Sequence, residues 1–195
     1  MPRGRLLAGA VAFEGGLLVL ALVLDRVLGV WSLASVRVTV RGILLGLAAV
    51  VPLLLGLALT MRAPTGPLAR LRDDVDQIVT LLFRRARPAD IVLISLLAGL
   101  GEEALFRGVM LNGLHRAFGP AVAFFGTALM FGLGHAVTRR YALYATVVGA
   151  YLGWVVIASG DLVVAAVAHA AYDALALGWL IARHRPPALA RSGDQ

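Results

Sequence analysis

Ionisable side chains interrupt the long apolar stretches of this 195-residue chain, and they are the residues that could do chemistry. They come from three separate stretches: Glu102, Glu103, Arg107, His135, His169 and Asp173. An ionised side chain at the centre of a lipid bilayer costs about 3 kcal/mol on insertion scales, so such groups face one another or a wet cavity and usually mark function. The pattern therefore predicts a polar site assembled from distant parts of the chain.

The spacing within the first of these stretches separates two carboxylates. Glu103 and Arg107 are four residues apart with the acid first, the favourable order for an ion pair on a helix, so Glu103 could serve only to neutralise Arg107. Glu102 is turned about 100° from Glu103 and has Phe106 one turn further on in place of a basic residue. Glu102 is therefore the carboxylate that remains available to a cavity, where it could work as a general base.

The two histidines complete the candidate cluster. His169 and Asp173 are four residues apart on one helix face, so Asp173 can hold one ring nitrogen of His169 and leave the other to act. His135 needs a polar partner from another helix, and a lone histidine in a membrane helix is often only an interhelical hydrogen bonder. Two histidines and a carboxylate pair on three helices favour a catalytic cluster instead. Glu14, isolated in the first apolar stretch, is interpreted as structural or as an accessory residue.

Two histidines and a glutamate suggest the activation of water, by one of two routes. Without a metal, Glu102 takes a proton from water, while His135 and His169 position the water and stabilise the tetrahedral oxyanion. With zinc, the same three residues are the ligands and water takes the open position. The spacing does not separate these routes, so no cofactor is favoured and zinc is the alternative. The chain has no H-E-x-x-H or G-x-S-x-G motif and no cysteine, which argues against the usual metalloprotease helix and against serine and cysteine nucleophiles.

The composition indicates the kind of scaffold that would hold this site. Hydrophobic residues are 60% of the chain and charged residues 15%, with a mean hydropathy of +0.87. A soluble domain is nearer half apolar and a quarter charged, so a typical soluble enzyme and a disordered chain are excluded. Stretches of roughly 20 mostly apolar residues predict membrane spans, at Leu6–Leu24, Gly42–Thr60, Ile91–Leu114, Ala121–Val137, Ala142–Ser159 and Leu162–Ala182. The predicted fold class is all-α, a polytopic membrane bundle of about six transmembrane helices.

One further helix is expected between the second and third spans. In the stretch from Pro67 to Arg85, apolar residues recur at helical spacing with polar residues between them. This pattern predicts an amphipathic helix on the membrane surface or packed on the bundle. The predicted organisation is therefore a two-span region with this interfacial helix at 1–88, a four-span catalytic core at 89–183 and a disordered tail at 184–195.

The basic residues suggest how the chain lies in the membrane. The net charge is +7, but the arginines lie mostly between apolar stretches and lack the interleaved aromatics of a nucleic-acid surface, so no nucleic-acid partner is expected. Most arginines outside the spans fall in segments that are inside if the N-terminus is inside. The prediction is a multi-pass protein of the cytoplasmic membrane with both termini cytoplasmic. The oligomeric state is not predicted.

Three short motifs resemble those of a known family. Glu102-Glu103-Ala-Leu-Phe-Arg107 is similar to its E-E-x-x-x-R motif, and Phe131-Gly-Leu-Gly-His135 to its F-x-x-x-H motif. His169-Ala-Ala-Tyr-Asp173 resembles the third motif, H-x-x-x-N/D. The family is the CPBP group of intramembrane proteases, also called Abi or CAAX-protease-like, which includes the type II CAAX prenyl endopeptidases.

The resemblance implies a membrane-embedded glutamic protease. In that family the first Glu, here Glu102, activates water, and the second, here Glu103, supports the site together with Arg107. His135 and His169 complete the catalytic cluster. The prenyl endopeptidases end the third motif in Asn, which is thought to help hold the oxyanion. Because an ionised Asp cannot donate a hydrogen bond, Asp173 is expected to orient His169 instead.

The leading hypothesis is therefore an endopeptidase that hydrolyses a peptide bond of a membrane-anchored protein or a membrane-associated peptide. The lipid bilayer and that substrate are its expected partners. The short spans and the use of Arg without Lys suggest a bacterial protein, for which a prenylated substrate is not expected. The alternatives are a non-catalytic membrane scaffold or bacteriocin-immunity factor that keeps the fold, and a proton or ion carrier that uses the same Glu and His as a relay.

Overall fold

The protein is a bundle of α-helices, and the computed structural model describes residues 3–184. Within these residues there is no β-strand. The α-helices are α1 (Arg3–Val27), α2 (Val40–Arg62), α3 (Gly66–Phe83), α4 (Pro88–Glu103), α5 (Leu111–Phe118), α6 (Pro120–Gly134), α7 (Arg139–Ser159) and α8 (Leu162–His184). A 3-10 turn, η1 (Leu33–Ser35), follows α1, and a π-helical segment, η2 (Ala104–Met110), joins α4 to α5. The all-α prediction is confirmed. The predicted disordered tail begins with His184, which is helical, and the rest of that prediction lies outside the described residues.

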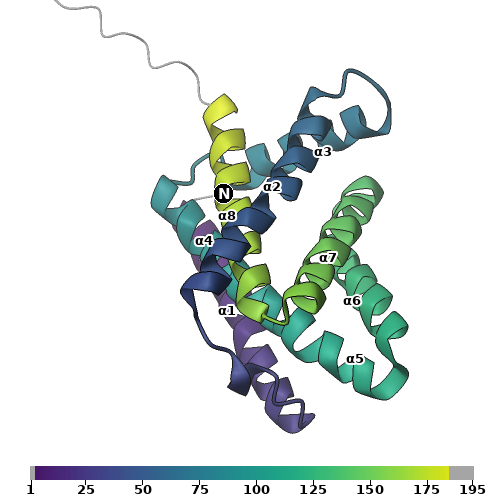
Figure 1. Ribbon diagram of the computed structural model, residues 1–195. Helices are drawn as coiled ribbons and strands as arrows, with labels where there is room; N and C mark the ends of the chain where they lie inside the picture. The colour runs from purple at the N-terminus through teal and green to yellow at the C-terminus, as the bar shows by residue number, and fades with distance from the viewer. Residues whose placement is uncertain (1–2, 185–195) are drawn as a thin grey trace, which may run out of the picture.

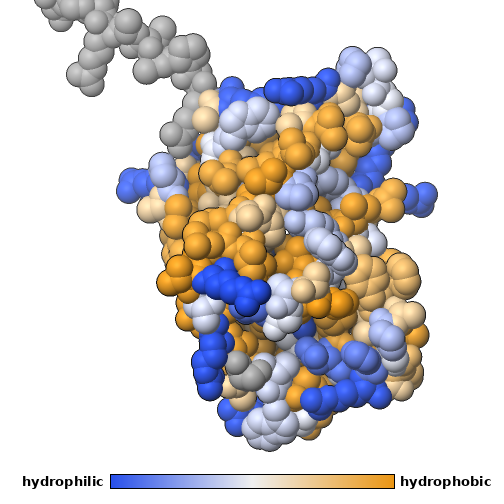
Figure 2. All heavy atoms as spheres, in the orientation of Figure 1, coloured by the Kyte–Doolittle hydropathy of each residue, from blue (hydrophilic) through white to orange (hydrophobic). Residues whose placement is uncertain are grey.

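In the part of the chain that the structure describes, four helices are long and apolar enough to cross a membrane by length and composition: α1, α2, α7 and α8. Helix α6 is apolar but has 15 residues. The predicted third span corresponds to α4, η2 and α5 in succession, and the charges at its centre lie at the junction of α4 and η2. Figure 2 shows hydrophobic side chains over much of the middle of one face, with hydrophilic ones mainly toward its two ends. These apolar helices are those of a membrane protein, while the number of spans and the cytoplasmic termini remain predictions.

Local sequence explains where several helices begin and end. The hydroxyl of Thr39 accepts a hydrogen bond from Gly42 N at 2.9 Å, and that of Thr138 accepts one from Tyr141 N at 3.1 Å. These are N-caps, which satisfy backbone donors that the first turn of a helix leaves free. Gly160 adopts a left-handed conformation (φ 66°) that ends α7 and allows the sharp reversal into α8.

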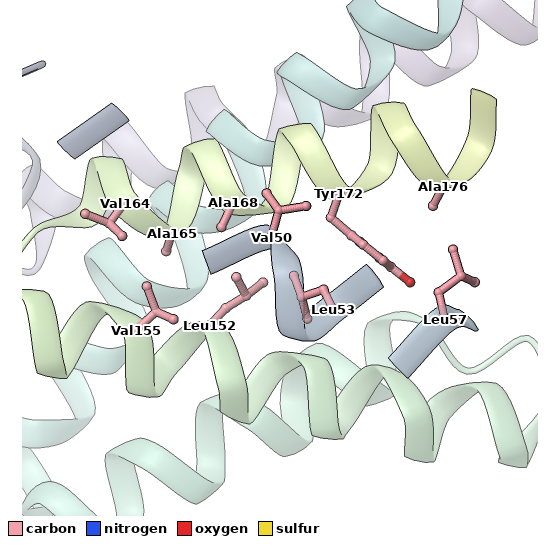
Figure 3. Close-up of a cluster of buried hydrophobic side chains, with 10 residues drawn as sticks. All are labelled: Val50, Leu53, Leu57, Leu152, Val155, Val164, Ala165, Ala168, Tyr172 and Ala176. Atoms are coloured by element: carbon pink, nitrogen blue, oxygen red, sulfur yellow. The ribbon is translucent and has the colours of Figure 1, made fainter. Parts of the chain in front are cut away.

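Helix α8 lies at the centre of the bundle and carries the last motif. It packs against α2, α4 and α7, and Figure 1 shows it in yellow among them. Figure 3 shows the largest core cluster, built from α2, α7 and α8: Val50, Leu53, Leu57, Leu152, Val155, Val164, Ala165, Ala168, Tyr172 and Ala176. Helices α4 and α8 approach closely at Gly99, where a Cβ would lie 2.7 Å from Ala166 O. Small residues thus bring the helices of the first and third motifs together.

The amphipathic helix α3 packs on the bundle through its apolar face. Leu71 and Val79 are buried, and Asp74 accepts two hydrogen bonds from Arg140 and one from Thr138, each at 2.8 Å. The bond from the Arg140 guanidinium is the main reason that the pKa of Asp74 is lowered from its ordinary value. The helix predicted at Pro67–Arg85 is therefore present, and it is attached to the start of α7. Its position at the membrane surface remains a prediction.

Candidate active site

Side chains from three distant stretches meet in one place. Glu102 lies in the last turn of α4, His135 immediately follows α6, and His169 is in the middle of α8. The Glu102 carboxylate is 3.8 Å from His135 Nε2 through Oε1 and 4.0 Å from His169 Nε2 through Oε2. The Oε2 atom is buried and has no hydrogen-bond partner. The carboxylate therefore lies between two imidazoles, with one oxygen directed at each.

The second nitrogen of each ring is held by the protein. His135 Nδ1 is 2.9 Å from Phe131 O, and because a carbonyl oxygen only accepts, Nδ1 carries the proton. His169 Nδ1 is 2.8 Å from Glu103 Oε1 and donates to that carboxylate. In the neutral form of each ring the proton is then on Nδ1, so both Nε2 atoms face Glu102 as acceptors. Three acceptor groups face one region of the site, where a water molecule could donate its two protons to two of them.

Glu103 and Arg107 form a buried ion pair behind this cluster. Arg107 Nη1 donates to Glu103 Oε1 at 2.6 Å, and the two side chains are 1% and 0% exposed. Arg107 Nη2 donates to Gly149 O of α7 at 2.8 Å. Because Glu103 Oε1 accepts from both Arg107 and His169, Glu103 does more than neutralise Arg107. It also fixes the orientation of a second histidine.

A π-helical segment, η2, begins directly after Glu103 and contains Arg107. In η2 the turn is wider than in an α-helix, and Leu111 N donates to Phe106 O, five residues back. The side chain of Asn112 donates to Arg107 O at 3.1 Å and to Gly108 O at 2.7 Å, which occupies carbonyls at the end of the segment. Single π-helical turns inside α-helices occur frequently at functional sites. Here the wide turn follows directly after Glu102 and Glu103.

Phe131 connects the ion pair with His135. The Arg107 guanidinium lies 4.4 Å from the centre of the Phe131 ring, and the His135 ring stacks on Phe131 with centroids 4.5 Å apart at 26°. The edge of His169 also approaches Phe131, with centroids 5.9 Å apart. The Phe of the second motif is thus a spacer that contacts three polar members of the site.

Asp173 lies beside one ring nitrogen of His169, and this is the nitrogen that also faces Glu102. Its Oδ2 atom is 3.5 Å from His169 Nε2, the nitrogen that also faces Glu102. The hydrogen bond that orients His169 through Nδ1 comes from Glu103 instead. The physical reason is that Glu103 is completely buried next to His169, whereas Asp173 is 29% exposed at the cavity. Asp173 is therefore a charged neighbour of the ring nitrogen that faces Glu102, and the other ring nitrogen is held by Glu103.

A cavity leads to the histidines. It offers about 120 Å³ to water molecules, and its lining includes His135, His169 and Asp173. Apolar residues of α2, α3 and α8 form much of the remaining wall. Since one water needs only about 10–15 Å³ of such space, the cavity has room for several. A cavity lined by both histidines and by many apolar side chains is suited to a peptide bond between residues with apolar side chains.

Some members of the site carry no signal in the sequence. Gly149 contributes only a carbonyl, and glycine is common in membrane helices. Tyr141 and Tyr144 line the cavity, and Tyr144 is hydrogen-bonded to Tyr172 at 2.7 Å between hydroxyls. A tyrosine near the end of a membrane helix is expected at the interface in any case. These residues can be assigned to the site only from the packing of the helices.

The donor atoms around Glu102 are of the kind that zinc accepts, two imidazole nitrogens and a carboxylate. Their arrangement differs from a metal centre, because no group of three His, Cys, Asp or Glu side chains among residues 3–184 is placed to hold a metal ion. The zinc route remains the alternative that the sequence predicts.

Comparison with models of known protein families gives a match. The family model for the type II CAAX prenyl endopeptidase Rce1-like family matches residues 85–175, just under half of the chain. The matched segment contains all three motifs, from Glu102 to Asp173, and confirms the family resemblance. Searches of curated proteins and of solved structures found no match.

Proposed function

Because residues 85–175 belong to the Rce1-like family of type II CAAX prenyl endopeptidases, we propose that the protein is an intramembrane endopeptidase in which Glu102 activates water. The observation that carries this proposal is the position of the Glu102 carboxylate, 3.8 Å from His135 Nε2 and 4.0 Å from His169 Nε2. Among residues 3–184, no arginine pairs with this carboxylate and no hydrogen bond is made to its Oε2 atom. This oxygen is therefore free to accept a proton from the water that attacks the substrate.

The proposed reaction is the hydrolysis of a peptide bond. Glu102 takes one proton from water, and the water oxygen forms a bond to the scissile carbonyl carbon. The carbonyl π electrons move to oxygen and give a tetrahedral oxyanion. When that intermediate collapses, the C–N bond breaks and the leaving nitrogen receives the proton held by Glu102. The products are one new carboxyl group and one new amine.

The histidines serve this reaction through their Nε2 atoms. In the neutral state the water donates one proton to Glu102 and the other to one of the two Nε2 atoms, which directs its oxygen toward the substrate. When His169 carries a second proton, its Nε2–H becomes a donor to the oxyanion. Glu103 and Asp173, 2.8 Å and 3.5 Å from the His169 nitrogens, balance the charge of that imidazolium. His135, whose side chain is 27% exposed, is the histidine nearer to the open cavity.

The proposed substrate is a membrane-anchored protein or a membrane-associated peptide. The cavity wall is mostly apolar, with residues such as Leu57, Val75 and Leu177. An extended segment with apolar side chains would bury them there while its backbone reached the histidines. The substrate's sequence is left to experiment.

The test compares membrane proteomes from cells that carry the wild-type protein, Glu102→Gln, His135→Ala or Asp73→Asn. Glu102→Gln keeps the shape of the side chain and removes the base, and loss of a general base typically costs about 10²–10⁴-fold in rate. Asp73→Asn removes an equal charge from an exposed position, 57% exposed on α3, and is the matched control. Cleavage products should be present with wild type and Asp73→Asn and absent with the other two, at equal protein levels.

Activity that persists in Glu102→Gln would rule out this mechanism and favour the scaffold reading. Metal analysis of the purified protein tests the zinc route in parallel. Bound zinc at one atom per chain, with cleavage lost on chelation and restored by zinc, would reassign Glu102 from base to ligand.

A further inference from the structure

Another pocket lies where the start of α1 meets the end of α3. It offers about 290 Å³ to water molecules, and it shares no lining residue with the cavity of the candidate active site. Its polar lining consists of Arg3 of α1, Thr80 of α3, and Arg84 and Arg85, which follow α3 directly. Three guanidinium groups and a hydroxyl around one pocket indicate a ligand that carries negative charge.

Asp90 neutralises one of the three arginines. Arg3 Nε donates to Asp90 Oδ2 at 2.6 Å, and the Asp90 side chain is 6% exposed. The side chains of Arg84 and Arg85 are exposed, and neither forms an ion pair or a hydrogen bond with any residue between 3 and 184. The pocket therefore has two guanidinium groups whose N–H donors are available to a ligand.

Exposed leucines complete the lining of this pocket. Leu81 is 80% exposed and Leu82 is 41% exposed, and both lie in α3 shortly before the two arginines. Leu6 belongs to α1, which is long and apolar enough to cross a membrane. A free inorganic anion gains nothing from this apolar surface, whereas a phospholipid has acyl chains attached next to its phosphate. The combination of arginines and exposed leucines favours an amphiphilic anion.

We propose that this pocket binds an anionic phospholipid, with its phosphate held by Arg84 and Arg85 and its acyl chains against Leu6 and Leu81. The planar guanidinium suits this role because it can donate two parallel hydrogen bonds to phosphate. Basic pockets between membrane helices on the cytoplasmic side bind lipid headgroups, and the arginine distribution predicts that side for this end of the bundle. The proposal does not depend on the endopeptidase function.

The position of the pocket gives the lipid a structural role. The phosphate connects the start of α1 with the end of α3, and Arg3 is itself paired with Asp90 of α4. Val75 and Val79 of α3 line the cavity of the candidate active site. The lipid therefore fixes one end of a helix that forms part of the wall of that cavity.

Native mass spectrometry of the purified protein in detergent tests the proposal, with phosphatidylglycerol or phosphatidylcholine of equal chain length added. The test variant combines Arg84→Gln with Arg85→Gln. The matched control combines Arg70→Gln with Arg139→Gln, which removes the same charge from exposed positions in α3 and at the start of α7. Wild type and control should bind phosphatidylglycerol more tightly than phosphatidylcholine. Because hydrogen bonds to charged groups are lost, the test variant should bind phosphatidylglycerol at least about tenfold more weakly.

Equal binding of phosphatidylglycerol by the two double variants would overturn the proposal, as would equal binding of the two lipids by wild type. Thermal unfolding separates a lipid from a free anion, since a bound ligand raises the midpoint of unfolding. Phosphatidylglycerol should raise the midpoint of wild type, and inorganic phosphate at the same concentration should not. An equal rise with inorganic phosphate would assign the pocket to a free anion and overturn its assignment to a lipid.

Hydrogen exchange in lipid vesicles tests the effect on α3. The amides at the end of α3 should exchange more slowly in vesicles that contain phosphatidylglycerol than in vesicles of phosphatidylcholine alone. This difference should be absent when Arg84 and Arg85 are both replaced by Gln and present in the matched control. The same protection in the variant that lacks both arginines would overturn the proposal. Because no measurement follows cleavage, failure of the endopeptidase function leaves these results unaffected.

Discussion

Two arginine–carboxylate pairs in this protein have similar geometry and very different surroundings. Glu103 and Arg107 meet at 2.6 Å in the interior with both side chains at most 1% exposed. Asp74 and Arg140 meet at 2.8 Å where α3 packs on α7; the Asp74 side chain is 10% exposed, whereas that of Arg140 is 46% exposed. A buried pair leaves an uncompensated charge if one partner is lost, whereas water replaces a lost partner at the surface. The comparison indicates that the interior pair belongs to both the fold and the site, while the outer pair only attaches α3.

The largest effect on stability is expected from Arg107→Met. The change leaves the Glu103 carboxylate buried without its cation, and such losses cost about 3–5 kcal/mol. Thermal unfolding of the purified protein in detergent should show a large drop in midpoint. Arg70→Met, an exposed arginine on α3, is the matched control and should unfold like wild type. Equal midpoints for the two variants would mean that the interior pair is not what the geometry indicates.

A double variant sharpens the distinction between fold and site. Replacing a buried ion pair with apolar side chains of similar volume is often neutral or stabilising, so Glu103→Leu combined with Arg107→Met should regain most of the lost midpoint. His169 would still lack the acceptor for its Nδ1 proton, now 2.8 Å away in Glu103. Cleavage should therefore stay low in the double variant although the fold recovers. Recovery of both would show that Glu103 serves the fold alone.

Arg140→Ala should have a much smaller effect on global unfolding than Arg107→Met. It removes two hydrogen bonds to Asp74, while Thr138 still donates one. The expected change is local, with faster hydrogen exchange in α3 and little in α8. An equally large change in α8 would contradict the view that this pair only attaches α3.

The attachment of α3 should weaken in acid. Hydrogen bonds from Arg140 lower the pKa of Asp74 below its ordinary value of 3.8, so the ionised form is favoured in the folded state. This stabilisation is fully present above the ordinary pKa and is lost as the pH falls through the lower folded value. Hydrogen exchange or limited proteolysis of α3, followed from neutral pH into this acidic range, should show the loosening. In Asp74→Asn the acid-dependent step should disappear.

Part of this arrangement could be predicted from the sequence. Charges in apolar stretches must find partners, which is why Glu102, His135 and His169 could be expected to meet. The amphipathic spacing predicted the helix α3, and both of its predicted ends lie within two residues of the observed ends. In both cases the order of polar and apolar residues along the chain is enough for the prediction.

Other features depend on packing that residue types do not specify. The choice of Glu103 over Asp173 as the partner of His169 Nδ1 depends on which acid the α4–α8 contact buries. The π-helical turn adds one residue per turn without any proline or other local signal. Gly149 enters the site through its backbone. Each of these follows from the relative positions of helices, which short motifs do not encode.

The stack of Arg107, Phe131 and His135 has a consequence for substitutions elsewhere. The guanidinium is held by Gly149 O, and its face rests on the ring that in turn supports His135. A Cβ at Gly149 would lie 3.2 Å from Phe131 Cβ, tighter than ordinary contact. A methyl group added to α7 would thus push the aromatic ring and tilt an imidazole that α7 itself does not supply. A substitution at Gly149 of α7 would therefore slow hydrolysis although it changes no ionisable residue and places nothing in the cavity.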